Sequence, residues 1–187
     1  DVIVTEVDPV RALQARMDGY RVMTMKEAAP KGDVFLTATG MRDVVIGEHM
    51  KVMKDGAIMG NAGHYNVEVN EPDLIALSKG KKRVRHALDE YETKDGRHLY
   101  LVGEGRLINL AAGSGHPSSV MDLSFAAQFN AMMWLKKHGK DLKPAVYEFP
   151  KELDQETAKL KLETMGITID EWTEEQKRYA KSYAEGT

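Results

Sequence analysis

The sequence contains no cysteine among its 187 residues, which excludes disulfide bonds, thiolate catalysis and cysteine-ligated zinc. It also lacks any apolar run of about 18 residues, so we expect no membrane-spanning helix. Neither sign of charge is in large excess, because 26 Lys and Arg face 29 Asp and Glu, and we expect neither nucleic acid nor a membrane as a partner. No basic segment precedes an apolar one at the start, so no secretory signal is expected; these absences are compatible with a cytoplasmic protein.

Several catalytic motifs are absent as well. No HExxH pattern and no cluster of histidines and carboxylates at metal-binding spacing occurs, so no metal site is expected. The nucleophile motif GxSxG and the phosphate-binding P-loop are also missing. Four of the six histidines are interpreted as surface or packing residues: His49, His86, His98 and His138. The basic run Lys79–Arg85 is interpreted as a solvated turn and strand edge.

Short apolar runs alternate with helical patterns, which is typical of βα units on a parallel sheet, so the expected fold class is α/β. The expected strands are Val2–Thr5, Arg21–Met23, Asp33–Thr37, Ala57–Gly60, Arg83–Tyr91 and Leu99–Gly103. The expected helices are Pro9–Met17, Met25–Ala29, Glu48–Lys54, Ser119–His138, Lys151–Met165 and Thr173–Tyr183.

Local signals support individual elements. Asp8 precedes Pro9 as a helix N-cap does, and Asp95-Gly96 between two strand patterns predicts a hairpin. Ser119 with Asp122 three residues later resembles a capping box at the start of the longest helix. The 11 methionines are interpreted chiefly as core-filling residues.

Three expected strands are followed by polar or Gly-rich segments, namely Glu6, residues 37–40 (TATG) and residues 61–64 (NAGH). Open α/β sheets bind ligands at the carboxyl ends of their strands, and glycines let a ligand approach unpaired backbone N–H groups there. An acid after the second strand of a dinucleotide-binding unit accepts bonds from a ribose diol and selects NAD over NADP. Each signal also has a plain alternative: a solvated acid, an ordinary turn, a loop histidine or, for Asn109, a bond to backbone.

The stretch GSGHPSSVMD is a second segment rich in residues that could serve a function. Gly113 and Gly115 make the backbone flexible, and Pro117 fixes the next φ before the long helix begins. Two interpretations stay open from this pattern: an ordinary helix entry, or a hinge that carries His116 into a cleft.

Five stretches, in order, resemble the adenosylhomocysteinase (S-adenosyl-L-homocysteine hydrolase) family. They are VIVTEVDPVRALQARMDGYRV, DVFLTATG, MKDGAIMGNAGHYNVEV, EGRLINLAAGSGHPSSVMDLSF and WTEEQKRYAKSY. The resemblance covers nearly the whole chain, and NAGHYNVE with GRLINL…GHPSSVM are its specific strings. It implies a partial Rossmann-like NAD-binding domain without the first strand and its Gly-rich loop, followed by a helical C-terminal segment.

The resemblance also implies that the chain is a fragment in three parts. Residues 1–114 correspond to the later part of the NAD-binding domain, and residues 115–150 to a hinge and the long return helix of the substrate domain. Residues 151–187 correspond to a C-terminal helical oligomerisation segment. The large N-terminal part with most substrate-binding and acid/base residues is missing, so the isolated fragment is expected to be inactive.

The reaction implied for the whole protein is the reversible hydrolysis of S-adenosyl-L-homocysteine to adenosine and L-homocysteine. The ribose 3′ carbon loses a hydride to tightly bound NAD, and the resulting ketone acidifies the 4′ hydrogen. Homocysteine is then eliminated from the 5′ carbon, water adds, and the hydride returns. The family also implies a cytoplasmic homo-oligomer, a tetramer.

The resemblance assigns roles to particular residues. Glu6 is expected to bind the adenosine ribose of NAD, residues 62–64 to lie near the nicotinamide, and Asn109 to bond its carboxamide. The implied cofactor-binding residues are Glu6, Thr39, Ala62, Gly63, His64 and Asn109. The implied catalytic residues are His64 and His116, which line the adenosine pocket.

Some positions depart from the family pattern. Arg11 stands where many members have Asn, Met41 replaces a polar residue of some bacterial members, and Asn66 stands where many have Asp. The last residues, SYAEGT, lack a Lys- and Tyr-bearing tail that reaches a neighbour's NAD in many members. Two alternatives remain: an NAD-dependent 2-hydroxyacid dehydrogenase, for which no clear His, acid and Arg set is present, and a non-catalytic regulatory relative.

Overall fold

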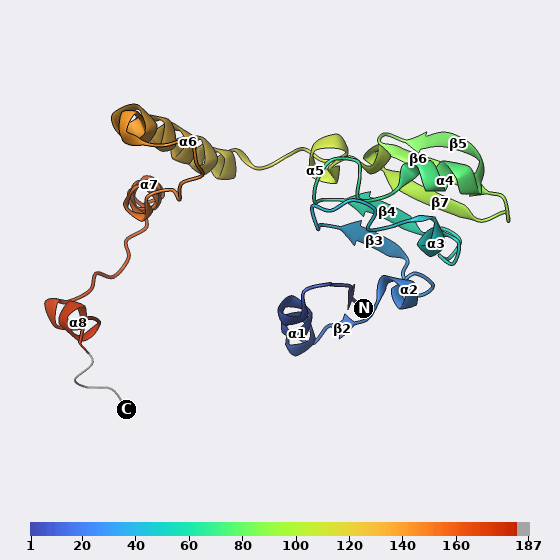
Figure 1. The fold of residues 1–187 in the computed structure, drawn as a ribbon, viewed down its shortest axis with the longest axis horizontal. Coiled ribbons are helices and arrows are strands. Elements are labelled where there is room, and N and C mark those ends of the chain that lie inside the picture. Colours follow the sequence, from blue (N-terminus) through green and yellow to red (C-terminus); the bar gives the residue numbers. More distant parts are fainter. Residues whose placement is uncertain (183–187) are drawn as a thin grey trace. The chain divides into compact units, whose positions relative to one another are not determined.

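The computed structural model describes residues 1–182, and the chain divides into two units, the first ending at Gly115 and the second beginning at His116 (Figure 1). The strands of the first unit are β1 (Ile3–Val4), β2 (Arg21–Val22), β3 (Val34–Thr37), β4 (Ile58–Asn61), β5 (Ser78–Arg85), β6 (Leu88–Thr93) and β7 (His98–Val102). Its helices are α1 (Pro9–Met17), α2 (Met25–Ala28), α3 (Gly47–Met50), α4 (Glu71–Leu77), the 3₁₀ helix η1 (Gly103–Gly105) and α5 (Ile108–Ala111).

The first unit contains two sheets. Strands β1 and β2 form a parallel pair, and a five-stranded sheet has the order β3-β4-β7-β6-β5. Strands β3, β4 and β7 run parallel, whereas β6 and β5 continue the sheet antiparallel. The parallel pairs confirm the expected α/β class with a Rossmann-like arrangement, and the antiparallel hairpins extend it on one side.

Helix starts follow the predicted capping chemistry in α1. The Asp8 carboxylate accepts hydrogen bonds from the backbone N–H of Val10 at 2.8 Å and of Arg11 at 3.2 Å, and Pro9 occupies the first helical position. These bonds satisfy two of the backbone donors that a helix leaves free at its N-terminus. The predicted bounds Pro9–Met17 are confirmed.

The core of the first unit lies between the five-stranded sheet and the helices that precede its strands. Its buried apolar side chains are Phe35, Val45, Met50, Met53, Ala57, Met59, Val69, Leu74, Tyr91, Leu99 and Leu101. Three methionines thus fill the core as expected, but the expectation is wrong for others, since Met17, Met41, Met132 and Met165 are exposed.

The expected strand Arg83–Tyr91 is wrong as a single element. A turn interrupts it at Ala87, whose φ of 54° is left-handed, and the chain forms two antiparallel strands, β5 and β6. Helix α4 was not expected. The basic run Lys79–Arg85 lies on β5, which forms one edge of the sheet, as the strand-edge interpretation predicted.

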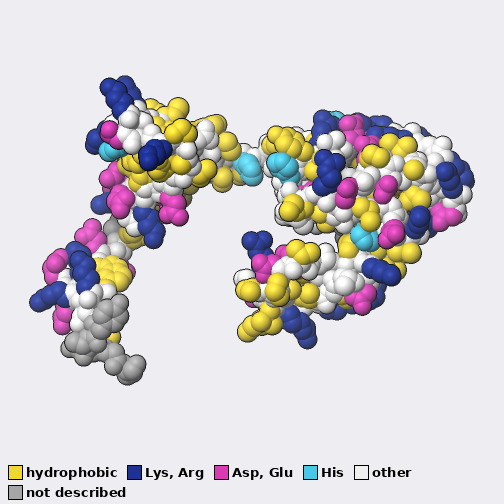
Figure 2. All heavy atoms as spheres, viewed as in Figure 1, with side chains coloured by type: hydrophobic (Ala, Val, Ile, Leu, Met, Phe, Trp, Pro, Cys, Tyr) yellow, Lys and Arg dark blue, Asp and Glu magenta, His cyan; other side chains and the backbone are white. Residues whose placement is uncertain are grey.

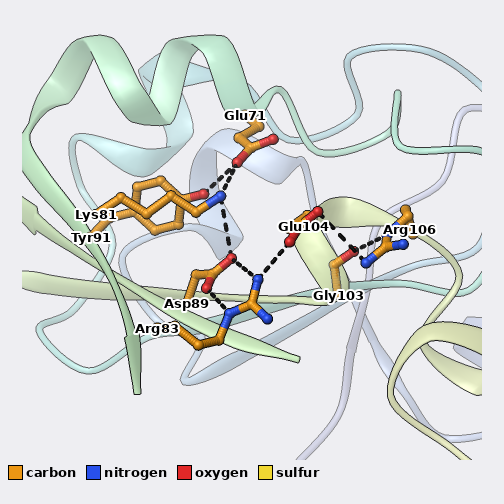
Figure 3. A network of polar contacts seen from close by, with 8 residues as sticks. All are labelled: Glu71, Lys81, Arg83, Asp89, Tyr91, Gly103, Glu104 and Arg106. Atoms are coloured by element: carbon orange, nitrogen blue, oxygen red, sulfur yellow. Dashed lines mark hydrogen bonds and ion pairs between the residues drawn. The ribbon is translucent and has the colours of Figure 1, made fainter. Parts of the chain in front are cut away.

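A polar network holds α4 and the turn around η1 onto this hairpin (Figure 3). The buried carboxylate of Asp89 pairs with both Lys81, at 3.2 Å, and Arg83. Lys81 also donates to Glu71 at 2.9 Å, and Arg83 reaches Glu104. These pairs give every charge in the cluster a partner of opposite sign, which a buried carboxylate such as Asp89 requires.

The second unit is helical within the described residues. Its elements are α6 (Ser118–His138), the 3₁₀ helix η2 (Gly139–Asp141), α7 (Lys151–Thr164) and α8 (Glu174–Tyr179). The expected capping box is wrong: α6 begins after Pro117 with no side-chain cap, and Asp122 instead pairs with Lys161 of α7 at 2.6 Å. Residues 183–187, which end the expected last segment, lie outside the described residues. No helix within 1–182 is long and apolar enough to span a membrane.

Candidate functional site

The carboxyl ends of β3 and β4 lie side by side. In their parallel register Thr37 is opposite Asn61, and an isolated parallel bridge pairs Asn61 with Leu107. The segments that follow these strands, 38–40 and 62–64, and the start of α5 therefore lie at the same edge of the sheet. This is the edge at which open α/β sheets bind ligands.

A cleft of about 540 Å³ opens next to this edge, between β1 and β3. Glu6, at the end of β1, and Thr39, after β3, both line the cleft. Two residues that the sequence predicted as cofactor-binding are thereby brought to one cavity. The walls also include apolar side chains such as Ile3 and Phe35 and charged ones such as Asp1 and Lys31, so the cleft has a mixed apolar and polar lining.

The Glu6 carboxylate is ionised, and only one of its two oxygens accepts hydrogen bonds from the described chain. Its Oε1 accepts hydrogen bonds from the backbone N–H of Asp8 at 3.0 Å and of Val7 at 2.6 Å, and these bonds lower the pKa of Glu6 below its ordinary value. Its Oε2 accepts no hydrogen bond from any residue in the described chain. An ionised acceptor with a free oxygen suits a diol ligand.

Asn61 is a buried amide that shapes the turn after β4. Its side-chain nitrogen donates to the carbonyl oxygens of Tyr65 at 2.6 Å and Gly105 at 2.8 Å, and its oxygen accepts from the Gly63 N–H at 2.9 Å. One side chain thus holds the turn 62–64 against the segment that leads to α5. The sequence analysis placed Asn61 among polar strand-end residues but found no role for it.

Thr39 donates hydrogen bonds to an acid within the same chain. Its backbone N–H and hydroxyl both donate to the Glu68 carboxylate at 3.0 Å, and the Gly40 N–H donates to it at 2.7 Å. The N–H groups of Thr39 and Gly40 are therefore paired with Glu68, and a contact between this turn and NAD stays a prediction. Sequence reasoning assigned no role to Glu68, although Glu68 is the last residue of the family-specific string NAGHYNVE.

The remaining residues of the first unit present accessible groups. His64 and Ala62 are exposed, and the His64 ring packs edge-on against Tyr65, with 4.4 Å between ring centroids. Asn109, in α5, is half-buried, and its side-chain amide makes no hydrogen bond to any of residues 1–182. His116 is exposed and belongs to the second unit, so its partnership with His64 stays a prediction.

Comparisons with known proteins decide the family. Residues 1–115 match the family model described as "S-adenosyl-L-homocysteine hydrolase, NAD binding domain". The chain belongs to this family. The matched region coincides with the first structural unit, so the α/β unit corresponds to the NAD-binding domain of this family, and NAD is its cofactor.

Curated relatives match the whole chain. The adenosylhomocysteinase of Aquifex aeolicus is 54% identical over 186 residues, and that of Thermococcus kodakarensis is 53% identical over 186 residues. The S-inosyl-L-homocysteine hydrolase of Methanopyrus kandleri is 52% identical over 188 residues. Each match covers 100% of this chain and 44% of the relative, so the chain spans less than half the length of these relatives.

The residues present fit the dinucleotide of this hydrolase family. The ionised Glu6 lines a cleft and has a free oxygen, as recognition of a ribose diol requires. The free amide of Asn109 stands at the same sheet edge as residues 62–64, where it can exchange two hydrogen bonds with a carboxamide. The Glu6 carboxylate thus offers an acceptor for a ribose diol and the Asn109 amide offers a partner for a carboxamide, and their contacts with NAD stay predictions.

Proposed function

We propose that the whole protein hydrolyses S-adenosyl-L-homocysteine reversibly to adenosine and L-homocysteine with tightly bound NAD. The observation that carries this proposal is the similarity to adenosylhomocysteinases along the entire chain, at 54% identity to one of them. The positions of residues 62–64 and Asn109 at one sheet edge, and of Glu6 in the cleft next to it, support it, since these are residues to which the resemblance assigns cofactor contacts.

Each residue has a definite task in this proposal. Glu6 accepts hydrogen bonds from the adenosine ribose hydroxyls and disfavours a 2′-phosphate. Asn109 forms hydrogen bonds with the carboxamide, and residues 62–64 lie along the nicotinamide. The backbone of the turn at Thr39 lies against NAD, whereas the Thr39 hydroxyl bonds Glu68. His64 and His116 contact the nucleoside substrate. Bound NAD supplies a reversible hydride acceptor for the ribose 3′ carbon.

The test is product formation by the whole protein. S-adenosyl-L-homocysteine is added, and free homocysteine is followed with a thiol reagent while adenosine is followed by chromatography. Equimolar adenosine and homocysteine, lost when NAD is removed and regained when it is added back, are expected. Binding of NAD without any hydrolysis favours the non-catalytic regulator, and oxidation of a 2-hydroxy acid favours the dehydrogenase.

A second candidate substrate is S-inosyl-L-homocysteine. Two relatives, at 52% and 51% identity, are named S-inosyl-L-homocysteine hydrolase and match this chain about as well as the adenosylhomocysteinases do. The two substrates differ only in the purine, so the same assay with each nucleoside decides between them. We propose the adenosyl substrate as the first candidate, and a kcat/KM ratio in favour of the inosyl substrate would reverse that choice.

We also propose that the whole protein is a cytoplasmic homotetramer. Two surfaces are candidates for the subunit contacts: residues 151–187, which the resemblance assigns to oligomerisation, and the apolar surface of α6, where Phe125 and Phe129 are 61% and 59% exposed. Exposed aromatic side chains at i and i+4 on a helix are typical of a surface that packs against another chain. The absence of cysteine and the NAD cofactor support the compartment.

A further inference from the structure

Glu68 is a buried carboxylate between the turn after β3 and the turn after β4. Its side chain is 0% exposed. It accepts hydrogen bonds from the Thr39 N–H and hydroxyl at 3.0 Å, the Gly40 N–H at 2.7 Å and the His64 N–H at 2.9 Å. A single side chain therefore receives four donors from two segments that are separated by more than twenty residues in the sequence.

The two turns are packed so closely around this carboxylate that one of them requires glycine. A Cβ atom added at Gly63 lies 1.9 Å from Oε1 of Glu68 and 2.8 Å from the backbone nitrogen of Thr39. Such distances are far inside van der Waals contact, so no larger residue fits without displacing a turn. The positions of Thr39, Gly63 and His64 are thus mutually dependent, with Glu68 at their centre.

The negative charge of Glu68 is held by hydrogen bonds alone. Burial raises the pKa of a carboxylic acid, but the hydrogen bonds from Thr39 and Gly40 outweigh it and lower the pKa of Glu68 below its ordinary value. Glu68 forms no ion pair with any Lys, Arg or His among residues 1–182. A neutral amide in its place presents N–H groups to N–H donors, so replacing the carboxylate breaks bonds rather than only weakening them.

We propose that Glu68 is a positioning residue of the dinucleotide site, which clamps the 38–40 turn to the 62–64 turn and thereby places the backbone that faces the nicotinamide half of NAD. This role rests on the proposed function of the site. Glu68 itself does not contact the cofactor; it acts through the backbone at Thr39 and His64.

The test compares NAD with ADP-ribose, which lacks the nicotinamide, in the whole protein carrying Glu68→Gln. Dissociation constants for both ligands are measured by equilibrium dialysis of NAD-free protein. Loss of positioning is expected to weaken NAD about tenfold more than ADP-ribose, because only NAD uses the 62–64 turn. A merely structural role lowers the melting temperature and weakens both ligands by the same factor.

Two further variants complete the experiment. Glu48→Gln makes the same substitution at an exposed acid of α3 and is expected to change neither dissociation constant. Glu68→Asp keeps the charge but shortens the reach, and is expected to show the same selective loss; it decides the matter if Glu68→Gln fails to fold. An unchanged NAD to ADP-ribose ratio in folded variants overturns this inference alone. Wild-type protein that binds neither ligand overturns the proposed function and this inference with it.

Discussion

At the scale of single residues, Glu6 offers the sharpest test of cofactor choice. Replacing it with Gln removes a charged acceptor, whose bonds are worth about 1.5–3 kcal/mol each, and leaves a neutral one worth about 0.5–1.5. We expect Glu6→Gln to weaken NAD binding by about tenfold or more and to strengthen NADP binding, because repulsion of the 2′-phosphate is removed. Calorimetric titration of both dinucleotides checks this, and an unchanged NAD to NADP ratio would show that Glu6 is only a solvated acid.

The residues that sequence reasoning found are marked by their place in the order of elements, whereas the residues that it missed act through tertiary hydrogen bonds. Glu6 and His64 follow strands and Asn109 lies in the first turn of a helix, so the order of elements predicts that they lie near the carboxyl ends of strands. Asn61 and Glu68 act through hydrogen bonds to backbone groups of distant segments, such as Gly105 and Thr39. Those partners are set by the tertiary fold, so no local pattern reveals them.

At the scale of secondary-structure elements, the bounds of helices and strands could be predicted where capping or turn residues mark their ends. Helix α1 has an Asp and a Pro at its start and a Gly shortly after its end, and its bounds were predicted correctly. The expected strand 83–91 was wrong because the turn uses Ala87 in a left-handed conformation, with no glycine to mark it. Helix α4 leads directly into β5 at Ser78, again without a turn signal.

The end of α3 is fixed by a residue that is distant in the sequence, Arg97, and the Asp95 carboxylate that holds Arg97 makes stability depend on pH. The helix was expected to reach Lys54 but ends at Met50, and the Arg97 guanidinium takes the carbonyl oxygens of Met50 at 3.2 Å and Lys51 at 3.0 Å. Asp95 orients this guanidinium through bonds at 2.7 and 3.0 Å. Hydrogen bonds from Arg97 and Thr93 lower the pKa of Asp95 from 3.8 to about 2.

Because the folded-state pKa of Asp95 lies below the unfolded value, ionised Asp95 stabilises the fold above about pH 4, and this contribution is lost as the pH falls towards 2. Asp95→Asn is therefore expected to lower the urea midpoint at pH 7, with the gap from wild type closing as the pH falls below about 3. Urea unfolding of both proteins at pH 7, 4 and 2.5 measures it. A gap that is independent of pH would contradict the argument.

The exposed face of α6 carries a prediction about assembly. Figure 2 shows hydrophobic side chains along this helix, and its exposed apolar residues are Val120, Leu123, Phe125, Phe129, Met132, Met133 and Leu135. Burying a Phe side chain is worth about 1.5–3 kcal/mol, and a charge in its place is unfavourable in an apolar interface. Phe129→Glu is expected to weaken self-association of the whole protein by at least about tenfold.

Sedimentation velocity over a range of protein concentrations measures that change. Gln128→Glu introduces the same charge one residue away, at an exposed polar position of α6, and is the matched control. If both variants sediment as wild type does, the apolar face of α6 is not an interface between copies of the protein.

At the scale of the whole molecule, the chain changes from an α/β unit to a helical unit at Gly115, whose φ is +77°. Glycine adopts this conformation without strain, whereas a β-branched residue rarely does. The family match also ends at residue 115. We propose that this point is a hinge, at which the NAD-binding unit and the substrate-binding part of the whole protein close over the nucleoside and exclude water during the reaction.

Gly115→Val is expected to slow turnover of the whole protein about tenfold while NAD remains bound, because restricted φ and ψ angles hinder closure. His116→Ala is expected to lower both kcat and adenosine affinity, since the resemblance places this residue against the nucleoside. Gly139→Val is the matched control: its φ is −59°, and an added Cβ there meets no atom within 4 Å. Steady-state kinetics, adenosine binding and melting temperature are measured for all three. A plain helix entry predicts lower melting temperatures for the Gly115 and His116 variants with normal kinetics per folded molecule, and that result would rule out the hinge.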